Sequence, residues 1–490
     1  MRADAILSLA ALRQLEQDAA AQGLDLMAQA ARATADWVGG HLSPGARVLV
    51  AAGPGNNGGD ALQAALLLHR RGYHVDLLLP AAPATPATQA AMQTLQTAGL
   101  QPRATLAEDA PPPDLIIDGL FGIGLARDFA APWLDTIHQL NALAIPVLAL
   151  DTPSGLDPYR GTAANVAIRA SHTLTFLSHK PGLYMAAGAD LAGQVELAPL
   201  DYPSELCPSA EGELNRPLAL LPVRANDSHK GRFGSVLVIG GERGMLGAAL
   251  LAGRAAYAGG AGKVHLATLD DRLAVDPAAP ELMIQPLEPS STLPAADAVA
   301  IGPGLGQGSA ARHWLGHLIG TAQPLLLDAD ALNLLAGNST LQQALGRRQG
   351  ATVLTPHPAE AARLLACSTA DVQADRLAAA RALAQRLDSV VVLKGAGSLI
   401  VRPDGYYRLN TSGGPALAVA GQGDVLSGLV AALLAQGLPV FDAAALGVHL
   451  HGLAGDAYTR AEQGPIGLTA SATVPLLSRV INLTHTGAHG

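Results

Sequence analysis

The sequence contains few cysteines, few aromatic residues and few charges for its length. Its 490 residues include only Cys207 and Cys367, which argues against a disulfide framework or a thiolate zinc site and favours a reducing compartment. Aromatic residues make up 3% of the chain and charged residues 14%, whereas hydrophobic residues make up 49%. This composition is typical of tightly packed layers of helices and sheets, and by itself it indicates no activity.

The sequence also lacks the features that direct a chain to a membrane, to secretion or to nucleic acid. No uncharged apolar run approaches the roughly 20 residues that span a bilayer. Residues 1–10 have neither the basic start nor the long apolar core of a secretory signal. The net charge of −9 argues against a nucleic-acid partner, which would favour a basic face. We therefore expect a cytoplasmic protein that binds small molecules and neither a membrane nor nucleic acid.

Two common catalytic motifs are missing as well. The segment nearest to a P-loop, Gly262-Lys263-Val264, lacks the Ser or Thr after the lysine and has Tyr257 at the position of the leading glycine. His449 and His451 are two residues apart, so on a helix they point to different sides. The sequence thus argues against a P-loop nucleotidase and against a metalloenzyme built on these histidines.

Alternating strands and helices are the main pattern of the chain. Its length predicts two domains, and its apolar strands between helices predict an α/β fold in which each domain has a mostly parallel sheet covered by helices on both faces. Residues 5–42 are predicted to be helical. The proline-containing segment 199–222 lacks a periodic apolar pattern and is predicted to be a linker, which gives domains at residues 1–215 and 216–490.

The predicted strands share short apolar runs bounded by turn residues. In the first half they are residues 47–52, 75–79, 115–117 and 147–150. In the second half they are residues 235–239, 264–268, 298–301, 325–327, 352–354 and 390–393, followed by a hairpin, 398–401 and 406–409, around Pro403-Asp404-Gly405.

One segment near the end of the sequence combines several glycines with a single acid. Residues 419–428 read VAGQGDVLSG, and an apolar stretch suited to a helix begins at Val425. Glycine amides and a helix N-terminus favour an anion, whereas Asp424 repels phosphate and is well placed to take a proton from a hydroxyl that attacks it. The segment therefore indicates phosphoryl transfer to an alcohol. The structural alternative is that Asp424 caps the helix, a contribution of about 1 kcal/mol.

The first half has a glycine-rich loop, residues 53–60 (GPGNNGGD), directly after a predicted strand. Gly53, Gly55 and Gly58 satisfy the dinucleotide pattern G-x-G-x-x-G, and Asp76 follows at about the expected distance. Asp76 begins the second strand instead of ending it, which argues against a hydride-transfer domain. A tight turn without function is the remaining structural alternative.

Two further loops rich in glycine and acids, residues 118–128 and 151–157, follow the next two predicted strands. The carboxyl ends of parallel strands form the ligand crevice of an open α/β sheet, so the loops are expected to meet there. The oxygen atoms of Asn57, Asp118 and Ser154, with backbone carbonyls, suit a hard monovalent cation.

These segments resemble the signature segments of a known family. GPGNNGGD (53–60), DGLFGIGL (118–125) and DTPSGLD (151–157) are similar to those of the NAD(P)H-hydrate epimerases, which have a Rossmann-like fold. The second half resembles the ribokinase-like NAD(P)H-hydrate dehydratases. The pieces that carry this second resemblance are HKG (229–231), IGG (239–241), IGPGLG (301–306), DAD (328–330), TPHPAE (355–360), LKGAGS (393–398) and VAGQGDVLSG (419–428).

The resemblance implies a bifunctional enzyme that repairs a damaged cofactor. Hydrated NADH and hydrated NADPH carry a 6-hydroxyl group in two epimeric forms, which the first domain would interconvert. The second domain would use ADP or ATP, with Mg²⁺, to phosphorylate the hydroxyl of the S epimer. Loss of phosphate then restores the reduced nicotinamide. The fused arrangement of the two domains implies ADP, K⁺ is implied for the epimerase domain, and a homo-oligomer is the expected assembly.

The resemblance also implies roles for particular residues. Asp424 would be the base of the dehydratase, and Asp151 is our candidate for proton handling in the epimerase, with Lys180 as a second candidate. Potassium would be bound by Asn57, Asp118 and Ser154. Contacts with the hydrated dinucleotide are implied for Asn56, Asn57, Gly58, Gly59, Asp60, Gly122, Ile123, Gly124, Leu125, Ala126, Arg127, Asp128 and Asp151 in the first half, and for Ala248, Gly304, His357 and Asp424 in the second. Nucleotide contacts are implied for Lys394, Gly395, Ala396, Gly397, Ser398 and Gly423, and Gly421 and Gly423 would form the anion hole.

The chain departs from the family pattern in a few places. Ala61 stands where a glycine usually follows NNGGD, and Ala28 and Ala31 replace a glutamate and a glycine in an early helix. Gln422 stands where Ser, Thr or Met is more common. These departures leave an alternative open, a ribokinase-like small-molecule kinase whose first half is a degenerate binding domain.

Overall fold

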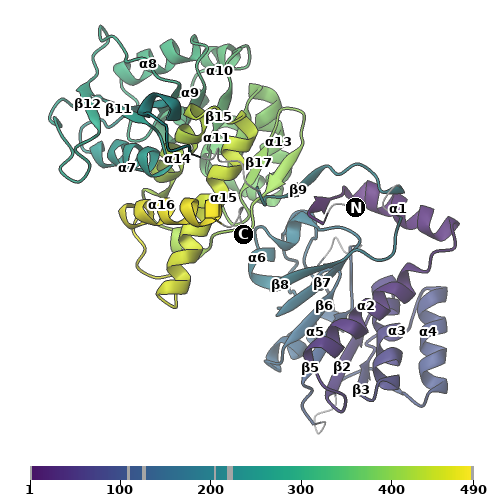
Figure 1. Cartoon of the computed structure of the whole chain (residues 1–490). Helices are drawn as coiled ribbons and strands as arrows, with labels where there is room; N and C mark the ends of the chain where they lie inside the picture. Colours follow the sequence, from purple (N-terminus) through teal and green to yellow (C-terminus); the bar gives the residue numbers. More distant parts are fainter. Residues whose placement is uncertain (1–2, 107–110, 124–127, 204–205, 218–223, 487–490) are drawn as a thin grey trace. The chain divides into compact units, whose positions relative to one another are not determined.

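The computed structural model of the chain describes residues 3–106, 111–123, 128–203, 206–217 and 224–486. Contacts within the chain divide it into two compact units, Met1–Glu213 and Leu214–Gly490. In both units strands and helices alternate along the chain (Figure 1), so the predicted α/β fold class is confirmed. The functional boundary after residue 215 stays a prediction.

The described part of the first unit contains a seven-stranded sheet in which neighbouring strands are parallel. The strand order β4-β3-β2-β5-β6-β7-β8 reverses its direction between β2 and β5, and such a switch point is where α/β sheets open a crevice. The strands are β2 (Arg47–Ala52), β3 (His74–Leu78), β4 (Pro102–Arg103), β5 (Leu115–Gly119), β6 (Val147–Leu150), β7 (His172–Phe176) and β8 (Gln194–Ala198).

Both faces of this sheet are buried under helices. Because side chains alternate along a strand, Val48 and Val50 of β2 pack into one core with α2, α3 and α4, whereas Leu49 packs on the other face with Ile137 of α5. The helices of this unit are α1 (Leu9–Ala21), α2 (Leu26–His41), α3 (Asn56–Arg70), α4 (Pro86–Thr97), α5 (Trp133–Ala142) and α6 (Gly188–Leu191).

Two short strands correct the sequence-based description of this unit. Residues 5–42 were predicted to be one helical region, but β1 (Ala5–Ile6) precedes α1 and α2. The predicted linker, 199–222, contains β9 (Gly212–Leu214), which pairs with β1 in antiparallel register. Strands of two or three residues are too short to show a period of two, so no pattern could indicate them. Residues 204–205 and 218–223 of this segment lie outside the described residues.

The second unit has a sheet with the order β18-β17-β16-β15-β14-β13-β10-β11-β12. Strands from β16 to β12 in this order pair in parallel, and β16, β17 and β18 pair antiparallel, as the hairpin prediction required. Its strands are β10 (Ser235–Gly240), β11 (Lys263–Thr268), β12 (Met283–Pro286), β13 (Ala298–Ile301), β14 (Leu325–Leu327), β15 (Thr352–Leu354), β16 (Val390–Leu393), β17 (Leu399–Val401) and β18 (Tyr407–Leu409).

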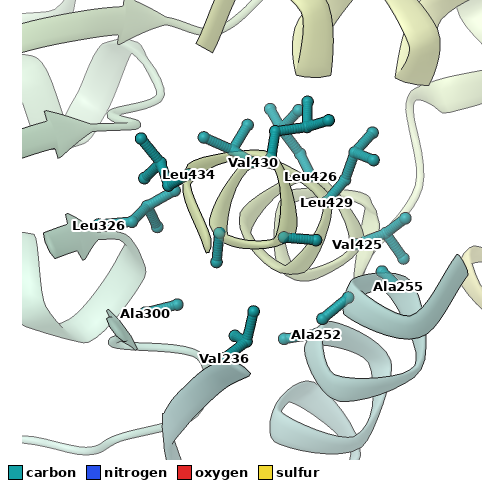
Figure 2. Packing of buried hydrophobic residues seen from close by; sticks show 14 of the residues in the cluster. Val236, Ala252, Ala255, Ala300, Leu326, Val425, Leu426, Leu429, Val430 and Leu434 are labelled. Atoms are coloured by element: carbon teal, nitrogen blue, oxygen red, sulfur yellow. The ribbon is translucent and has the colours of Figure 1, made fainter. Parts of the chain in front are cut away.

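Helix α14 (Gln422–Ala435) lies at the centre of this unit and is buried on all sides. Figure 2 shows apolar side chains of α14, among them Val425, Leu429 and Leu434, pointing outward in several directions, with α7 (Leu246–Ala258) and strands of the sheet beside the helix. A Cβ atom added at Gly428 would lie 1.9 Å from the carbonyl oxygen of Ala252, so the backbones of α14 and α7 are in close approach. Each fully buried leucine stabilises the fold by about 1.5–3 kcal/mol. This packing fixes the position of the N-terminus of α14.

The other helices of the second unit cover its sheet or pack against α14. In the part of the chain that the structure describes, none of the helices has the length and apolar character needed to cross a bilayer. They are α8 (Ser309–Ile319), α9 (Ala329–Ala336), α10 (Ser339–Leu345), α11 (Pro358–Leu365), α12 (Thr369–Ala374), α13 (Arg376–Leu387), α15 (Val440–Ala461) and α16 (Ala470–Thr486).

Candidate active sites

Asp424 lies in the first turn of α14, where the buried helix begins. The N-cap is Gly421, whose φ of 88° lies in the left-handed region that favours glycine. The alternative that Asp424 itself caps the helix is therefore wrong. Burial and repulsion from Asp328 raise the pKa of Asp424 to about 7, although Lys394 opposes the shift. A carboxyl group that titrates near neutral pH suits a general base.

An ion pair between Lys394 and Asp328 lies beside this carboxyl group. Asp328 follows β14 and Lys394 follows β16, and the parallel strands β14, β15 and β16 bring both residues to one edge of the sheet. Lys394 Nζ lies 2.8 Å from Asp328 Oδ1, and the Ser427 hydroxyl donates to Asp328 Oδ2 at 2.8 Å. A Cβ atom added at Gly423 would lie 3.3 Å from Lys394 Nζ, so the glycine lets α14 begin next to the ammonium group.

Glu360 is a further carboxyl group near this lysine, with Oε2 4.0 Å from Lys394 Nζ. It belongs to the capping box of α11, in which the backbone N–H of His357 donates to Glu360 Oε2 at 2.7 Å and that of Ala359 donates to His357 Nδ1 at 3.1 Å. Burial raises the pKa of Glu360 to about 7, with Lys394 opposing the shift. Burial acts to lower the pKa of Lys394, but attraction by Asp328 and Glu360 outweighs it and the pKa is raised. The lysine therefore keeps its charge.

Residues 394–398 form a tight strip between β16 and β17. Gly395 has a φ of 141° and Gly397 a φ of 65°, both in the region that favours glycine. The Ser398 hydroxyl closes the strip, because it donates to the carbonyl of Gly395 at 3.0 Å and accepts from its N–H at 3.3 Å. The strip begins at Lys394, so the predicted nucleotide contacts and the Asp424 carboxyl group lie on the same side of the unit.

Ala248 and Gly304 lie against one another at the start of α7. Gly304 has a φ of 58°, and an added Cβ atom there would lie 3.2 Å from Ala248 Cβ and 2.4 Å from the carbonyl oxygen of Met245. The N–H of Gly306 donates to Asp330 Oδ2 at 2.9 Å, and Asp330 raises the pKa of Asp424 through charge repulsion. Ala248 and Gly304, two of the four residues of this unit predicted to contact the dinucleotide, thus belong to one local surface.

His451 is a packed histidine, as the sequence favoured. It is buried on α15, and its Nε2 is 2.9 Å from Gln422 Oε1, whose amide nitrogen donates to Thr473 Oγ1 at 2.9 Å. Burial lowers the pKa of His451 to about 4, so the ring is neutral at pH 7. Gln422 therefore joins the start of α14 to α15 and α16, and its departure from the family pattern has this structural reason.

The first unit contains a cavity of about 1010 Å³ at the carboxyl ends of its strands. Residues from the three predicted loops line it together, although Pro54 of the first loop and Asp151 of the third are 97 positions apart in the sequence. The predicted site residues among its lining are Asn56, Asn57, Asp60, Gly122, Ile123 and Asp151.

Asp151 is held by several donors at the wall of this cavity. It is a non-glycine residue with a φ of 65°, a sparsely populated conformation that occurs often at functional sites. Its Oδ1 accepts a short hydrogen bond from Lys180 Nζ and one from the Phe176 N–H at 3.1 Å. Lys180 Nζ donates as well to Thr175 Oγ1 at 2.9 Å and to the Phe176 carbonyl at 2.7 Å. Lys180 thus orients Asp151.

Asp118 is fully buried at the end of β5 and is bound by neutral donors. The N–H of Ser154 donates to Oδ2 at 2.8 Å, the Ser154 hydroxyl donates to Oδ1 at 2.7 Å, and the N–H of Leu120 donates to Oδ1 at 3.2 Å. Burial raises the pKa of Asp118 to about 6, although the bonds from Ser154 lower it. The Asn57 amide nitrogen, also buried, has no hydrogen-bond partner among the described residues. These oxygen-rich side chains fit a monovalent cation.

Some predicted residues lie away from the cavity. Gly58 and Gly59 are buried in the first turn of α3, and a Cβ atom at Gly58 would lie 1.9 Å from the carbonyl oxygen of Gly53. These glycines permit the tight turn. Asp128 is exposed and accepts from the N–H of Asn165 at 3.1 Å. The predicted contacts Gly124, Leu125, Ala126 and Arg127 lie outside the described residues.

Ala61 fits at its position in spite of the family preference for glycine there. Its methyl group is fully buried, and the facing residue is Gly119, where an added Cβ atom would lie 2.4 Å from Ala61 Cβ. Gly119 of β5, which has no side chain, therefore makes room for the methyl group of Ala61. The wall between α3 and β5 keeps its packing.

Several residues of these sites were not predicted as site residues. Asp328 and Glu360 flank Lys394, and Glu16 of α1 lines the first cavity. Desolvation and repulsion from Asp151 raise the pKa of Glu16. One signal was present in the sequence: Glu16, although exposed, lies four residues after the buried Leu12 and therefore borders the buried side of α1.

Two family models match the chain. Residues 236–474 match the model described as NAD(P)H-hydrate dehydratase, and residues 23–182 match the model described as YjeF-related protein N-terminus. The first match contains Asp424 and the Lys394 strip, and the second contains the loops that line the cavity.

Known proteins are similar to the chain over both units. A bifunctional NAD(P)H-hydrate repair enzyme of Escherichia coli is 37% identical over 445 residues, which cover 89% of this chain and 85% of that protein. One of Coxiella burnetii is 35% identical over 497 residues, which cover 96% and 98% of the two chains. A crystal structure of an ADP/ATP-dependent NAD(P)H-hydrate dehydratase from Bacillus subtilis, with ATP/Mg²⁺, is 33% identical over 54% of this chain and 94% of that one, with a TM-score of 0.49.

Proposed function

The chain belongs to the family of bifunctional NAD(P)H-hydrate repair enzymes, and from this membership we propose how its two sites divide the reaction. It is an NAD(P)H-hydrate epimerase in its first half and an ADP-dependent NAD(P)H-hydrate dehydratase in its second. The relatives match both halves, which supports repair over the alternative of a small-molecule kinase with a degenerate first half. The roles of individual residues, the ions and the assembly are proposals.

In the second unit, Asp424 takes the proton of the 6-hydroxyl group of the S epimer. The hydroxyl oxygen then forms a bond to the terminal phosphorus of ADP or ATP, and the bond from that phosphorus to the bridging oxygen breaks. The phosphate ester next loses phosphate, because the lone pair of the ring nitrogen supports cleavage of the C–O bond. Loss of the proton from the neighbouring ring carbon restores the double bond of the reduced nicotinamide.

The other residues bind and position the two substrates. Lys394 and the amides of residues 395–398 bind the nucleotide phosphates, and Gly421 and Gly423 supply amides that face the transferred phosphoryl group. Ala248, Gly304 and His357 contact the hydrated dinucleotide. When bound with the nucleotide, Mg²⁺ would neutralise part of the charge of the phosphates. The observation that carries this proposal is a half-buried carboxyl group, with a pKa raised to about 7, that lies at the N-terminus of α14 beside a charged lysine.

In the first unit, the dinucleotide occupies the cavity and Asp151 handles the proton during epimerisation. Asn56, Asn57, Asp60, Gly122 and Ile123 line that cavity and would contact the substrate. Lys180 orients the carboxylate of Asp151 through the short hydrogen bond between them. Residues of α1 and α2 complete the wall, so the reacting ring is partly removed from water.

We propose that K⁺ binds between Asn57, Asp118 and Ser154. The ion would supply a fixed positive charge that holds the loops after β2, β5 and β6 together. The fit comes from Asp118, a buried carboxyl group whose hydrogen bonds described above come from neutral donors and whose pKa is raised to about 6 by burial. A bound cation would offset the free-energy cost of burying the ionised carboxylate of Asp118.

Potassium should therefore stabilise the first unit. At about ten times its Kd, K⁺ adds about 1.4 kcal/mol to the free energy of unfolding, which raises the Tm by a few degrees. The measurement is thermal unfolding of the whole chain in KCl and in LiCl of equal ionic strength. Asp118→Asn should remove the difference between the salts, whereas Asp76→Asn, which breaks the surface pair of Asp76 with Arg47, should keep it. Equal Tm values for the unchanged protein in both salts would contradict the site.

The proposed repair activity is tested with the whole chain, hydrated NADH as a mixture of epimers, Mg²⁺, and either ADP or ATP. We expect the absorbance of reduced nicotinamide to return for both epimers. Parallel assays with ADP alone and with ATP alone show which nucleotide the protein uses. An ordinary kinase would consume nucleotide without the return of this absorbance, and that result would reject the proposal.

We also propose that the protein works in the cytoplasm and forms a homo-oligomer. Cys207 and Cys367 are both free thiols, which is compatible with a reducing compartment. Light scattering of the purified chain would measure the assembly.

A further inference from the structure

Arg376 occupies an unfavourable place for a positive charge. It is the first residue of α13, where the helix dipole opposes a cation, and it is only 2% exposed. Burial lowers its pKa to about 10, and its Nε has no hydrogen-bond partner among the described residues. The more ordinary choice at the start of a helix is an acid or a neutral residue. Burial of a charged guanidinium group at this place costs free energy, so its presence suggests a function.

The guanidinium group is surrounded by oxygens of the strip that follows β16. Its Nη2 donates to the carbonyls of Leu393, Lys394 and Gly397 at 3.4, 3.3 and 3.4 Å, and its Nη1 donates to Gln373 Oε1 at 3.0 Å. One side chain thus contacts both ends of the nucleotide strip. These are long hydrogen bonds to neutral acceptors, but they share one donor group that carries a full charge.

The guanidinium group of Arg376 leaves no room for a side chain at position 395. An added Cβ atom would lie 2.8 Å from Arg376 Nη1 and 3.0 Å from Arg376 Nη2, and the φ of 141° is in the region that other residues rarely adopt. The glycine therefore lets the backbone pass directly over the charge. Arg376 and Gly395 fit each other.

The direction of the carbonyls determines the direction of the amides. In a planar trans peptide the C=O of one residue and the N–H of the next point to opposite sides. Since the carbonyls of Lys394 and Gly397 point to Arg376, the N–H groups of Gly395 and Ser398 point away from it, and the Gly395 N–H makes only a long bond of 3.3 Å to the Ser398 hydroxyl, for which a phosphate oxygen would compete. The strip therefore has acceptors on the side of the arginine and donors on the other side, with a positive charge behind them. Such an arrangement favours a phosphate group over a neutral ligand.

We propose that Arg376 is a positioning residue for the nucleotide, which holds the carbonyls of Leu393, Lys394 and Gly397 so that amides of the strip face the nucleotide phosphates. The inference rests on the proposed use of this strip by ADP or ATP. It adds a residue from α13 that does not itself touch the substrate. It acts through Gly395, Gly397 and Ser398.

The test compares Arg376→Lys and Arg376→Met with a matched control in the same unit. Arg348 is the control, because it is also a partly buried arginine whose guanidinium group holds backbone, donating to the carbonyl of Ala351 at 3.0 Å and to Thr352 Oγ1 at 2.8 Å. Burial lowers the pKa of Arg348 too. The control variants are Arg348→Lys and Arg348→Met. The readouts are the KM for nucleotide, the KM for hydrated NADH, kcat and the Tm.

We expect Arg376→Met to raise the KM for nucleotide roughly 10–100-fold, as for loss of hydrogen bonds made by a charged group. The KM for hydrated NADH should stay within about twofold, and Arg376→Lys should recover part of the loss because it keeps the charge. The Arg348 variants should lower the Tm without changing the ratio of the two KM values. Equal changes in both KM values for the Arg376 variants, or an unchanged KM for nucleotide, would overturn the proposal.

Binding of nucleotide alone separates this inference from the proposed function. Calorimetric titration of the whole chain with ADP and Mg²⁺, and separately with ATP and Mg²⁺, needs no turnover. If the unchanged protein binds nucleotide but does not restore reduced nicotinamide, the proposed function fails while the Arg376 variants still report on the strip. If Arg376→Met does not fold, Arg376→Lys gives the same comparison with a smaller change in shape.

Discussion

The variant Asp424→Asn should dehydrate hydrated NADH about 10²–10⁴ times more slowly than the unchanged protein, because it lacks the general base. Asparagine has nearly the same shape as aspartate and keeps the packing of α14, so the change removes the proton acceptor and little else. The Kd for nucleotide should stay within a few-fold, since Lys394 and the amides of the strip remain. Single-turnover recovery of reduced-nicotinamide absorbance measures the rate, and calorimetry measures the Kd.

The pH profile of the unchanged protein gives an independent sign of the same base. Burial and the repulsion of Asp328 raise the pKa of Asp424 to about 7, so at pH 6 most of this carboxyl group is protonated and inactive as a base. The rate of dehydration should therefore rise with pH through about 7 and then level off. Glu360 titrates in the same range, so Glu360→Gln should keep this rise if Asp424 causes it.

A surface acid of the same unit serves as the control for both measurements. Asp404 pairs with Arg402 at 2.6 Å in the exposed hairpin between β17 and β18, and Asp404→Asn should leave the rate and its pH profile unchanged. If Asp424→Asn keeps the full rate, another group takes the proton and the assignment of the base is wrong.

The sequence predicts the parts of the fold that depend on local pattern. The strands predicted from continuous apolar runs lie within about two residues of their predicted limits. The parallel strands β4, β7, β8 and β12 have no such run and were not predicted. Glycine-rich loops at the ends of β2, β5 and β6 predicted a site at the carboxyl edge of the first sheet, and these loops line one cavity. Such features follow from steric and hydrophobic rules that act over a few residues.

Other features depend on contacts between distant residues and have no local pattern. Lys394 and Asp328 are paired because β14, β15 and β16 are neighbours in the sheet, and nothing near either residue specifies that order. The sequence around Arg376 gives no sign of its role, because the role depends on the carbonyls of Leu393, Lys394 and Gly397, which are distant in the sequence. The contact of Gln422 with His451 likewise depends on how α14 and α15 pack.

The second large effect is expected for Asp151→Asn, which should slow epimerisation about 10²–10⁴-fold through loss of the proton-handling group. The carboxylate of Asp151 is held by Lys180 and by the Phe176 N–H in a backbone conformation that is rarely populated, as expected for a pre-organised catalytic group. The measurement uses the whole chain with a mixture of epimers and excess nucleotide. Absorbance should return rapidly for the S epimer and then continue only at the rate of spontaneous epimerisation.

The two halves of the chain provide internal controls for this result, because the rapid phase depends on the second unit and the slow phase on the first. In Asp151→Asn the rapid phase should keep its rate and amplitude, whereas in Asp424→Asn both phases should be lost. Asp157→Asn is the matched control in the same loop, since Asp157 accepts from the N–H groups of Tyr159 and Arg160 and does not line the cavity. A single rapid phase that recovers both epimers in Asp151→Asn would show that another residue of the cavity, such as Glu16 or Asp60, moves the proton.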